Sequence, residues 1–162
     1  MHKILLWVCL LCLVAPLAVA KTKMSSTIKC AKPSLEQMVP AGDRPNHSFG
    51  VTQGSCTSSK PWTIAGVAGK EGVGTSSVET DGDVSKSHGV YVETMENGDK
   101  GYYTYEATST TKDGQVQISG HKWQLEGGTG KLQGVKGQGT CKGSGTTDSL
   151  TYECEGEYTQ PK

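Results

Sequence analysis

Three side chains in the second half of the sequence could carry out acid–base chemistry: Tyr103, Tyr105 and His121. A histidine titrates near neutral pH and can act as a general base, while a tyrosine hydroxyl can polarise a carbonyl group. An isomerase or a cyclase needs both functions, so we assign these three residues a catalytic role. A structural interpretation stands beside it, in which the same groups hydrogen-bond one another inside a core, as buried Tyr and His usually do.

Beside these groups, Trp123, Tyr152 and Val92 are expected to form the wall of a small-molecule site. We predict no metal site, because the histidines lie far apart in sequence and no Cys or His follows at ligand spacing. We expect no cofactor, and no GxSxG, HExxH or P-loop pattern occurs. The 16 basic residues balance the 16 acidic ones without clustering, which argues against a nucleic-acid partner.

The N-terminal residues 1–20 are typical of a secretory signal peptide. A short basic start precedes the apolar run ILLWVCLLCLVAPLAVA, which ends in the small-x-small site Ala18-Val19-Ala20. A lipoprotein anchor is the alternative, but Val8 and Leu11 precede the cysteines where a small residue is preferred. No later segment has the roughly 20 apolar residues of a transmembrane helix. We therefore expect a secreted or periplasmic protein without a transmembrane segment.

Beyond the signal, the pattern is that of one all-β domain. Residues 21–45 contain prolines and little periodicity, and are expected to form an irregular arm. From 46 to 160, short runs rich in Val, Thr, Tyr and Ser alternate with Asn-Gly, Asp-Gly and Gly-Gly turns. We expect the exported protein to consist of the arm and this all-β domain.

Two turn signals set an expected register. A two-residue loop at Asn97-Gly98 is the strongest short hairpin signal and would pair Val92 with Tyr103. Tyr91 and Glu93 would then point outward. The inward face would comprise Val90, Val92, Tyr103, Tyr105 and Ala107. A second loop at Asp113-Gly114 continues that face into the next strand.

Strict alternation beyond the second loop would turn Trp123 and Leu125 outward. A bulge at Gly120 reverses the parity and directs His121, Trp123 and Leu125 inward, because one extra residue in a strand moves every later side chain to the other face.

Four cysteines follow the signal: Cys30, Cys56, Cys141 and Cys154. A two-residue loop at 147–148 would place Cys141 directly opposite Cys154, at a separation that a disulfide can span. Cys30 would then tie the arm to Cys56. In an oxidising compartment we expect these two disulfides, and the alternative is four reduced, buried thiols.

The run Gly127-Gly128-Thr129-Gly130-Lys131-Leu132, followed by glycines at 134, 137 and 139, resembles the signature shared by allene oxide cyclases, plant dirigent proteins and their bacterial barrel relatives. The resemblance covers roughly residues 46–158 and implies an antiparallel eight-stranded β-barrel. It also implies a homo-oligomer, since the cyclases and dirigents often form trimers. The glutamate that the cyclases use on an early strand has no counterpart in HSFGVTQGSC, so the resemblance does not extend to their reaction.

An eight-stranded barrel either fills itself with side chains or holds one small ligand. The first functional hypothesis is therefore a barrel that binds a small apolar or aromatic molecule, with isomerase-like or cyclase-like activity. The alternative is a non-catalytic extracellular or envelope module whose barrel is filled.

Overall fold

The computed structural model describes residues 20–161, which form ten β-strands and a single 3-10 turn. The predicted signal peptide lies almost wholly outside these residues. The elements in chain order are β1 (Thr22–Ala31), β2 (Leu35–Pro40), β3 (His47–Lys60), β4 (Thr63–Ile64), β5 (Val67–Asp81), β6 (Val84–Met95), β7 (Lys100–Lys112), β8 (Gln115–Gly128), η1 (Gly130–Leu132), β9 (Lys136–Thr146) and β10 (Ser149–Thr159).

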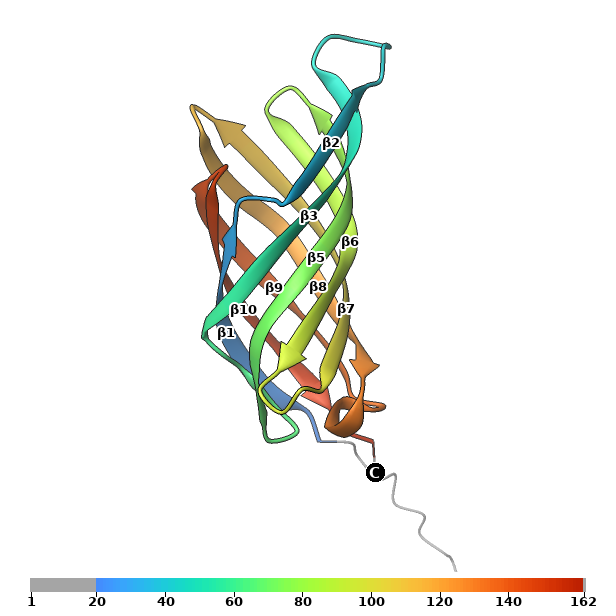
Figure 1. Ribbon diagram of the computed structural model, residues 1–162, viewed down its shortest axis with the longest axis vertical. Coiled ribbons are helices and arrows are strands. Elements are labelled where there is room, and N and C mark those ends of the chain that lie inside the picture. The colour runs from blue at the N-terminus through green and yellow to red at the C-terminus, as the bar shows by residue number, and fades with distance from the viewer. Residues whose placement is uncertain (1–19, 162) are drawn as a thin grey trace, which may run out of the picture.

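Eight of these strands close into an antiparallel barrel, as the sequence predicts. Their order is β3-β1-β10-β9-β8-β7-β6-β5, and a pairing between β3 and β5 completes the circle. The strands run steeply along the long axis of the molecule (Figure 1). The short strands β2 and β4 pair with β3 and β5 respectively, outside this set of eight.

The expected irregular arm is instead largely strand. Strand β1 lies between β10 and β3, and β2 continues along the edge of β3. In β1, Met24, Ser26 and Ile28 are buried at alternate positions, which is the period-2 pattern of a strand with one inward face. The prolines do not interrupt it, because Pro33 lies between the two strands and Pro40 ends the second.

The β6–β7 hairpin has a register one residue away from the prediction. Its loop holds three residues, since the backbone N–H of Met95 donates to the carbonyl of Asp99 at 2.9 Å and Gly98 has a φ of 86°. Three-residue hairpins of this kind place a residue with positive φ before the second strand. Tyr91 therefore pairs with Tyr103, and Val92 pairs with Tyr102. This shift turns Tyr91 and Glu93 inward, and Val90 and Val92 outward.

The β7–β8 hairpin and the bulge in β8 follow the prediction. Asp113 and Gly114, both with positive φ, form the two-residue loop between β7 and β8. The register then shifts around Gly120, at a φ of 61°, and directs Trp123 and Leu125 into the barrel.

Both predicted disulfides are present. Cys141 pairs with Cys154 directly across β9 and β10, and Cys30 pairs with Cys56 directly across β1 and β3. Each Cα–Cα separation is 4.0 Å.

The inward face of β9 is almost bare. Alternation from Cys141 places Gly137, Gly139, Gly143 and Gly145 on that face. A Cβ atom at Gly139 would lie 2.4 Å from the Trp123 ring, and one at Gly143 would lie 2.9 Å from side-chain atoms of Ile118 and Tyr152. The glycines therefore make room inside a narrow barrel for large side chains from β8 and β10.

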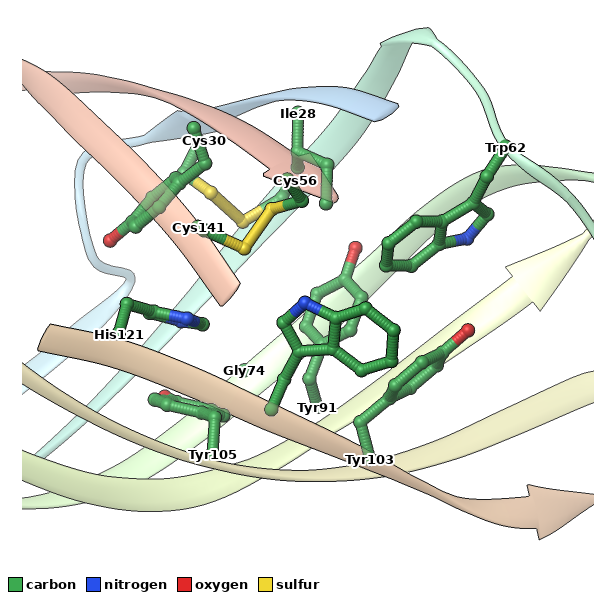
Figure 2. A pocket seen from close by; sticks show the side chains of 13 residues that line it. Ile28, Cys30, Cys56, Trp62, Gly74, Tyr91, Tyr103, Tyr105, His121 and Cys141 are labelled. Atoms are coloured by element: carbon green, nitrogen blue, oxygen red, sulfur yellow. A yellow bond between two sulfur atoms is a disulfide. The ribbon is translucent and has the colours of Figure 1, made fainter. Parts of the chain in front are cut away.

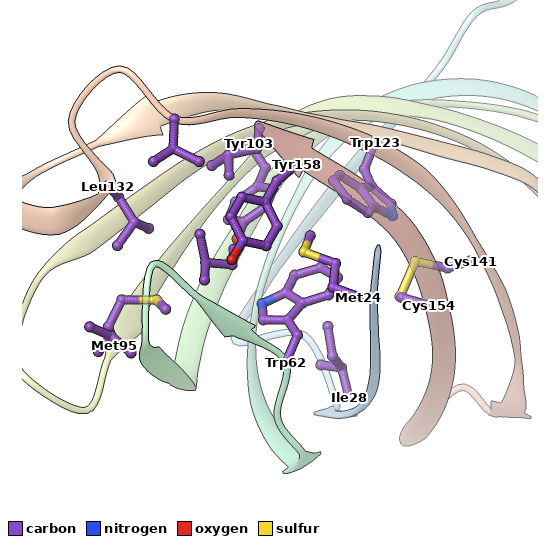
Figure 3. Packing of buried hydrophobic residues seen from close by; sticks show 14 residues of the cluster. Met24, Ile28, Trp62, Met95, Tyr103, Trp123, Leu132, Cys141, Cys154 and Tyr158 are labelled. Atoms are coloured by element: carbon purple, nitrogen blue, oxygen red, sulfur yellow. A yellow bond between two sulfur atoms is a disulfide. The ribbon is translucent and has the colours of Figure 1, made fainter. Parts of the chain in front are cut away.

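One end of the barrel is closed by the connection between β3 and β5. Trp62 and Ile64 from this connection are buried against Met24, Ile28 and the other core residues (Figure 3). The backbone N–H of Ala65 donates to the Tyr158 hydroxyl at 3.3 Å and ties the connection to β10. The hydrophobic core thus occupies the end of the barrel that holds β4 and η1, which contribute Ile64 and Leu132 to it.

Candidate functional site

Next to this core, the barrel interior contains a partly open cavity of about 110 Å³. All eight barrel strands and the β3–β4 connection contribute to its wall, which combines cysteines, aromatic rings and one imidazole. The lining residues are Ile28, Cys30, Cys56, Trp62, Gly74, Tyr91, Tyr103, Tyr105, His121, Trp123, Cys141, Tyr152 and Cys154. The volume is of the same order as the roughly 150 Å³ apolar cavity that holds benzene in another protein. The interior is therefore neither a solid core nor a wide channel.

The two sides of the cavity differ in chemistry. Both disulfides belong to its wall, and Figure 2 shows their sulfurs opposite the rings of His121 and Tyr105. The His121 imidazole stacks on the Tyr105 ring at 5.5 Å between centroids and 8° between planes. A flat, polarisable surface of this kind favours contact with another ring.

Three polar atoms in the cavity wall have no hydrogen-bond partner in the described part of the chain. They are the Tyr91 hydroxyl, Nδ1 of His121 and Nε1 of Trp123, and all three are shielded from bulk solvent. More than nine-tenths of buried polar groups in proteins are paired, so three unpaired ones around a single cavity call for an explanation. A bound molecule with polar atoms of its own would supply the missing partners.

Behind this wall lies a buried carboxylate that the sequence analysis placed outside. Glu93 is 0% exposed, and its Oε2 accepts a hydrogen bond from the Tyr103 hydroxyl at 2.7 Å. Nε1 of Trp62 donates to both carboxylate oxygens, at 3.1 and 3.0 Å. Burial raises the pKa of Glu93, against the opposing effect of these donors. Glu93 does not line the cavity, but it fixes two rings that do.

Burial also sets the ionisation of the cavity groups. It lowers the pKa of His121, so the imidazole is neutral at pH 7. It raises the pKa of Tyr105, and raises that of Tyr152 to about 12, so both phenols keep their protons. With Asp, Glu, Lys and Arg absent from the described lining, the cavity is uncharged.

Five of the six predicted site residues meet at this cavity: Tyr103, Tyr105, His121, Trp123 and Tyr152. The sixth, Val92, does not, because the one-residue register shift in β6 leaves it on the outer face with 36% of its surface exposed. The Tyr103 hydroxyl donates to Glu93 at 2.7 Å, so of the two predicted catalytic tyrosines Tyr103 is the one held by the buried carboxylate.

Trp62, Tyr91 and Glu93 are functional residues that were not predicted from the sequence. A hairpin with a three-residue loop would have brought Tyr91 and Glu93 to the inward face together with Tyr103, and this alternative parity was the available signal. Trp62 lies in a connection, where no periodicity indicates which way a side chain points.

A second polar cluster lies near the β2–β3 connection, away from the cavity. His47 is bonded through Nδ1 to Asp43 at 2.6 Å and through Nε2 to Glu79 at 3.1 Å. Arg44 donates to Asp81 at 2.6 and 3.1 Å. The bond to Asp43 raises the pKa of His47, and the same bond lowers the pKa of Asp43. These pairs fasten the connection to β5.

Within residues 20–161, we find no group of three or more His, Cys, Asp or Glu side chains arranged to hold a metal ion. The same residues contain no helix that is long and apolar enough to span a membrane.

Comparison with known proteins supports the fold and gives no information on binding or catalysis. No family model and no curated protein matches the sequence. Among solved structures, a conserved protein of unknown function from Rhodopseudomonas palustris aligns with 86% of this chain and 99% of its own, at 8% identity and a TM-score of 0.53. A protein of unknown function of the DUF3224 family from Shewanella oneidensis aligns with 88% of this chain and 100% of its own, at 15% identity and a TM-score of 0.52.

Proposed function

We propose that this protein binds a small, neutral, largely apolar molecule of about one ring inside its barrel. The observation that carries the proposal is the uncharged cavity of about 110 Å³ with three unpaired polar atoms in its wall. Apolar lining with a few polar groups is the usual composition of a ligand site. A charged ligand would lose its hydration in this cavity without gaining a counter-charge, which disfavours it.

The proposed place of action is outside the cytoplasm. The signal-like segment at 1–20 supports export, and the two disulfides fit an oxidising environment. The likeness of the GGTG corner to allene oxide cyclases and dirigent proteins belongs to this proposal as well, since both hold their ligands inside a barrel.

Catalysis of an isomerase-like or cyclase-like reaction is a second candidate function. Its support is the neutral imidazole of His121, which faces the cavity and could accept a proton from a bound molecule. The hydroxyl of Tyr105, whose ring stacks on His121, could assist this proton transfer. The filled-barrel module is less well supported, because the interior retains a cavity.

Binding can be tested by narrowing the cavity without disturbing the fold. A Cβ atom at Gly74, which lines the cavity, would lie 3.5 Å from the Tyr105 hydroxyl and 3.7 Å from the Tyr91 ring, both ordinary contacts. Gly74→Ala should therefore fold and lose space for a ligand. The matched control is Val73→Ala, which shortens an outward side chain on the same strand.

The assay is titration with toluene and benzaldehyde, followed by tryptophan fluorescence, since Trp62 and Trp123 both line the cavity. Saturable binding that Gly74→Ala weakens at least several-fold and Val73→Ala leaves unchanged is the expected result. Absence of saturable binding in the wild type, or equal binding in both variants, would overturn the proposal.

A further inference from the structure

We propose that the ligand carries an uncharged oxygen acceptor, a carbonyl or a hydroxyl, that accepts a hydrogen bond from Nε1 of Trp123. This inference rests on the proposed function, and it specifies the ligand class that the cavity selects. The ligand would be a one-ring oxygenated compound, such as an aromatic aldehyde or a phenol.

The two cavity tryptophans have opposite hydrogen-bond states. Nε1 of Trp62 is bonded to Glu93, whereas Nε1 of Trp123 has no partner among residues 20–161. Trp123 is only 4% exposed, so bulk water does not solvate its indole N–H. An indole nitrogen is a donor only, which means that the missing partner must be an acceptor.

The position of Trp123 explains why no protein group supplies that acceptor. Its ring packs against Gly139 and Gly156, where Cβ atoms would lie 2.4 Å from ring carbons. Figure 3 shows the indole nitrogen on the side of the ring that faces Cys141 and Cys154. That side belongs to the cavity wall, whose nearby atoms are disulfide sulfurs, which are poor acceptors.

The charge around the site restricts the acceptor to a neutral oxygen. Asp, Glu, Lys and Arg are all missing from the described lining, so a carboxylate ligand would find no cation. The buried Glu93, behind Trp62 and Tyr103, would repel an anion further. An amine cation would also lack a counter-charge, because the carboxylate of Glu93 already accepts hydrogen bonds from Trp62 and Tyr103.

The remaining two unpaired groups allow both oxygen types. The Tyr91 hydroxyl can donate or accept, and so can the neutral His121 imidazole according to its tautomer. A carbonyl oxygen can accept from Trp123 and Tyr91 together. A phenol hydroxyl can accept from Trp123 and also donate to His121.

The experiment is a ¹H–¹⁵N correlation spectrum of the indole groups, recorded while benzaldehyde, phenol, toluene or benzoate is added to the whole protein. The Trp123 signal is assigned from its absence in Trp123→Phe. We expect benzaldehyde, phenol or both to shift the Trp123 indole signal downfield and to leave the Trp62 indole signal nearly in place. We also expect at least one of them to bind about ten-fold or more tightly than toluene, and benzoate not to bind.

Two conservative variants separate the hydrogen bond from mere packing. Tyr91→Phe and Trp123→Phe should each reduce the preference for the oxygen compounds over toluene, while toluene binding persists. If Trp123→Phe fails to fold, the Trp123 signal is assigned instead as the indole signal that persists in Trp62→Phe and moves with the folded protein, and the wild-type spectrum and Tyr91→Phe then test the proposal.

The two proposals fail in different ways. If toluene binds as tightly as both oxygen compounds, or if the Trp123 indole signal does not move when they bind, the proposed hydrogen bond from Trp123 to the ligand is refuted. The proposal that the barrel binds a small molecule is then unaffected. If none of the four compounds binds in the cavity, the proposed function itself fails. A shift with benzaldehyde alone assigns a carbonyl ligand, and a shift with phenol alone assigns a hydroxyl.

Discussion

Replacing either of two tyrosines on adjacent strands by phenylalanine should change stability in opposite directions. Tyr91 and Tyr103 pair across β6 and β7, and their rings lie 6.1 Å apart in the same cavity wall. The Tyr103 hydroxyl donates to the buried carboxylate of Glu93, whereas the Tyr91 hydroxyl has no partner in the described chain. Each substitution removes one oxygen atom and keeps the ring.

The magnitudes follow from the hydrogen-bond states. A hydrogen bond to a charged group contributes about 1.5–3 kcal/mol, so Tyr103→Phe should lower the free energy of unfolding by about that amount. An unpaired buried hydroxyl costs about 1–3 kcal/mol of desolvation, so Tyr91→Phe should leave the free energy of unfolding unchanged or raise it. The two variants should therefore differ by about 2 kcal/mol or more.

Urea unfolding at pH 7 without ligand measures this difference. With a slope of about 1–3 kcal/mol per molar urea, the two midpoints should lie about 1 M apart, and Tyr91→Phe should have the higher one. If Tyr91→Phe lowers the midpoint as much as Tyr103→Phe does, the Tyr91 hydroxyl already has a hydrogen-bond partner in the protein and does not need one from a ligand. An unchanged midpoint in Tyr103→Phe would instead refute the Glu93 network.

Three further predictions concern the buried acid, the glycine face and the histidine cluster. Because burial raises the pKa of Glu93, ionising Glu93 destabilises the folded protein increasingly as pH rises through that pKa. The free energy of unfolding of Glu93→Gln should therefore rise relative to that of wild type between pH 4 and pH 8. A difference between the two proteins that stays constant with pH would contradict this. Gly139→Ala should lose about 1–3 kcal/mol or more, since its Cβ would lie 2.1 Å from the Glu155 carbonyl oxygen, whereas Gly74→Ala should lose little; equal thermal midpoints would refute the role of the bare face. The raised pKa of His47 gives stability that is complete below about pH 6.5 and is lost as pH rises through the folded pKa. The difference in melting temperature between wild type and His47→Gln should therefore shrink from pH 6 to pH 9, and a constant difference would count against the His47 ion pairs.

The sequence predicted the barrel well wherever a local signal determined the parity of a strand. The Asp113-Gly114 loop and the bulge at Gly120 both follow from residues that tolerate positive φ, and together they placed His121, Trp123 and Leu125 correctly. The cysteine pairs followed from the same counting.

The β6–β7 hairpin shows how the prediction failed. Asn-Gly is compatible with a two-residue loop and with a three-residue loop, and the choice depends on one backbone bond between Met95 and Asp99. The difference reverses every side chain of β6, so Val92 points outward, Tyr91 joins the cavity wall and Glu93 is buried behind it. The burial of Glu93 could not be recognised from the sequence, because it depends on hydrogen bonds donated by Trp62 and Tyr103.

The N-terminal strand was missed for a different reason. Prolines in 21–45 suggested irregular structure, but the partners of β1 are β10 and β3, from opposite ends of the chain. Such long-range pairing leaves little trace in a short window of sequence.

A crystal structure of the protein with benzaldehyde is the decisive experiment for the interior site, because it shows both where the ring lies and what its oxygen contacts. We predict one ring inside the barrel between the disulfides and His121, with its oxygen within hydrogen-bonding distance of Nε1 of Trp123. A cavity filled by ordered water, with benzaldehyde absent or bound only on the outer surface, would contradict the account.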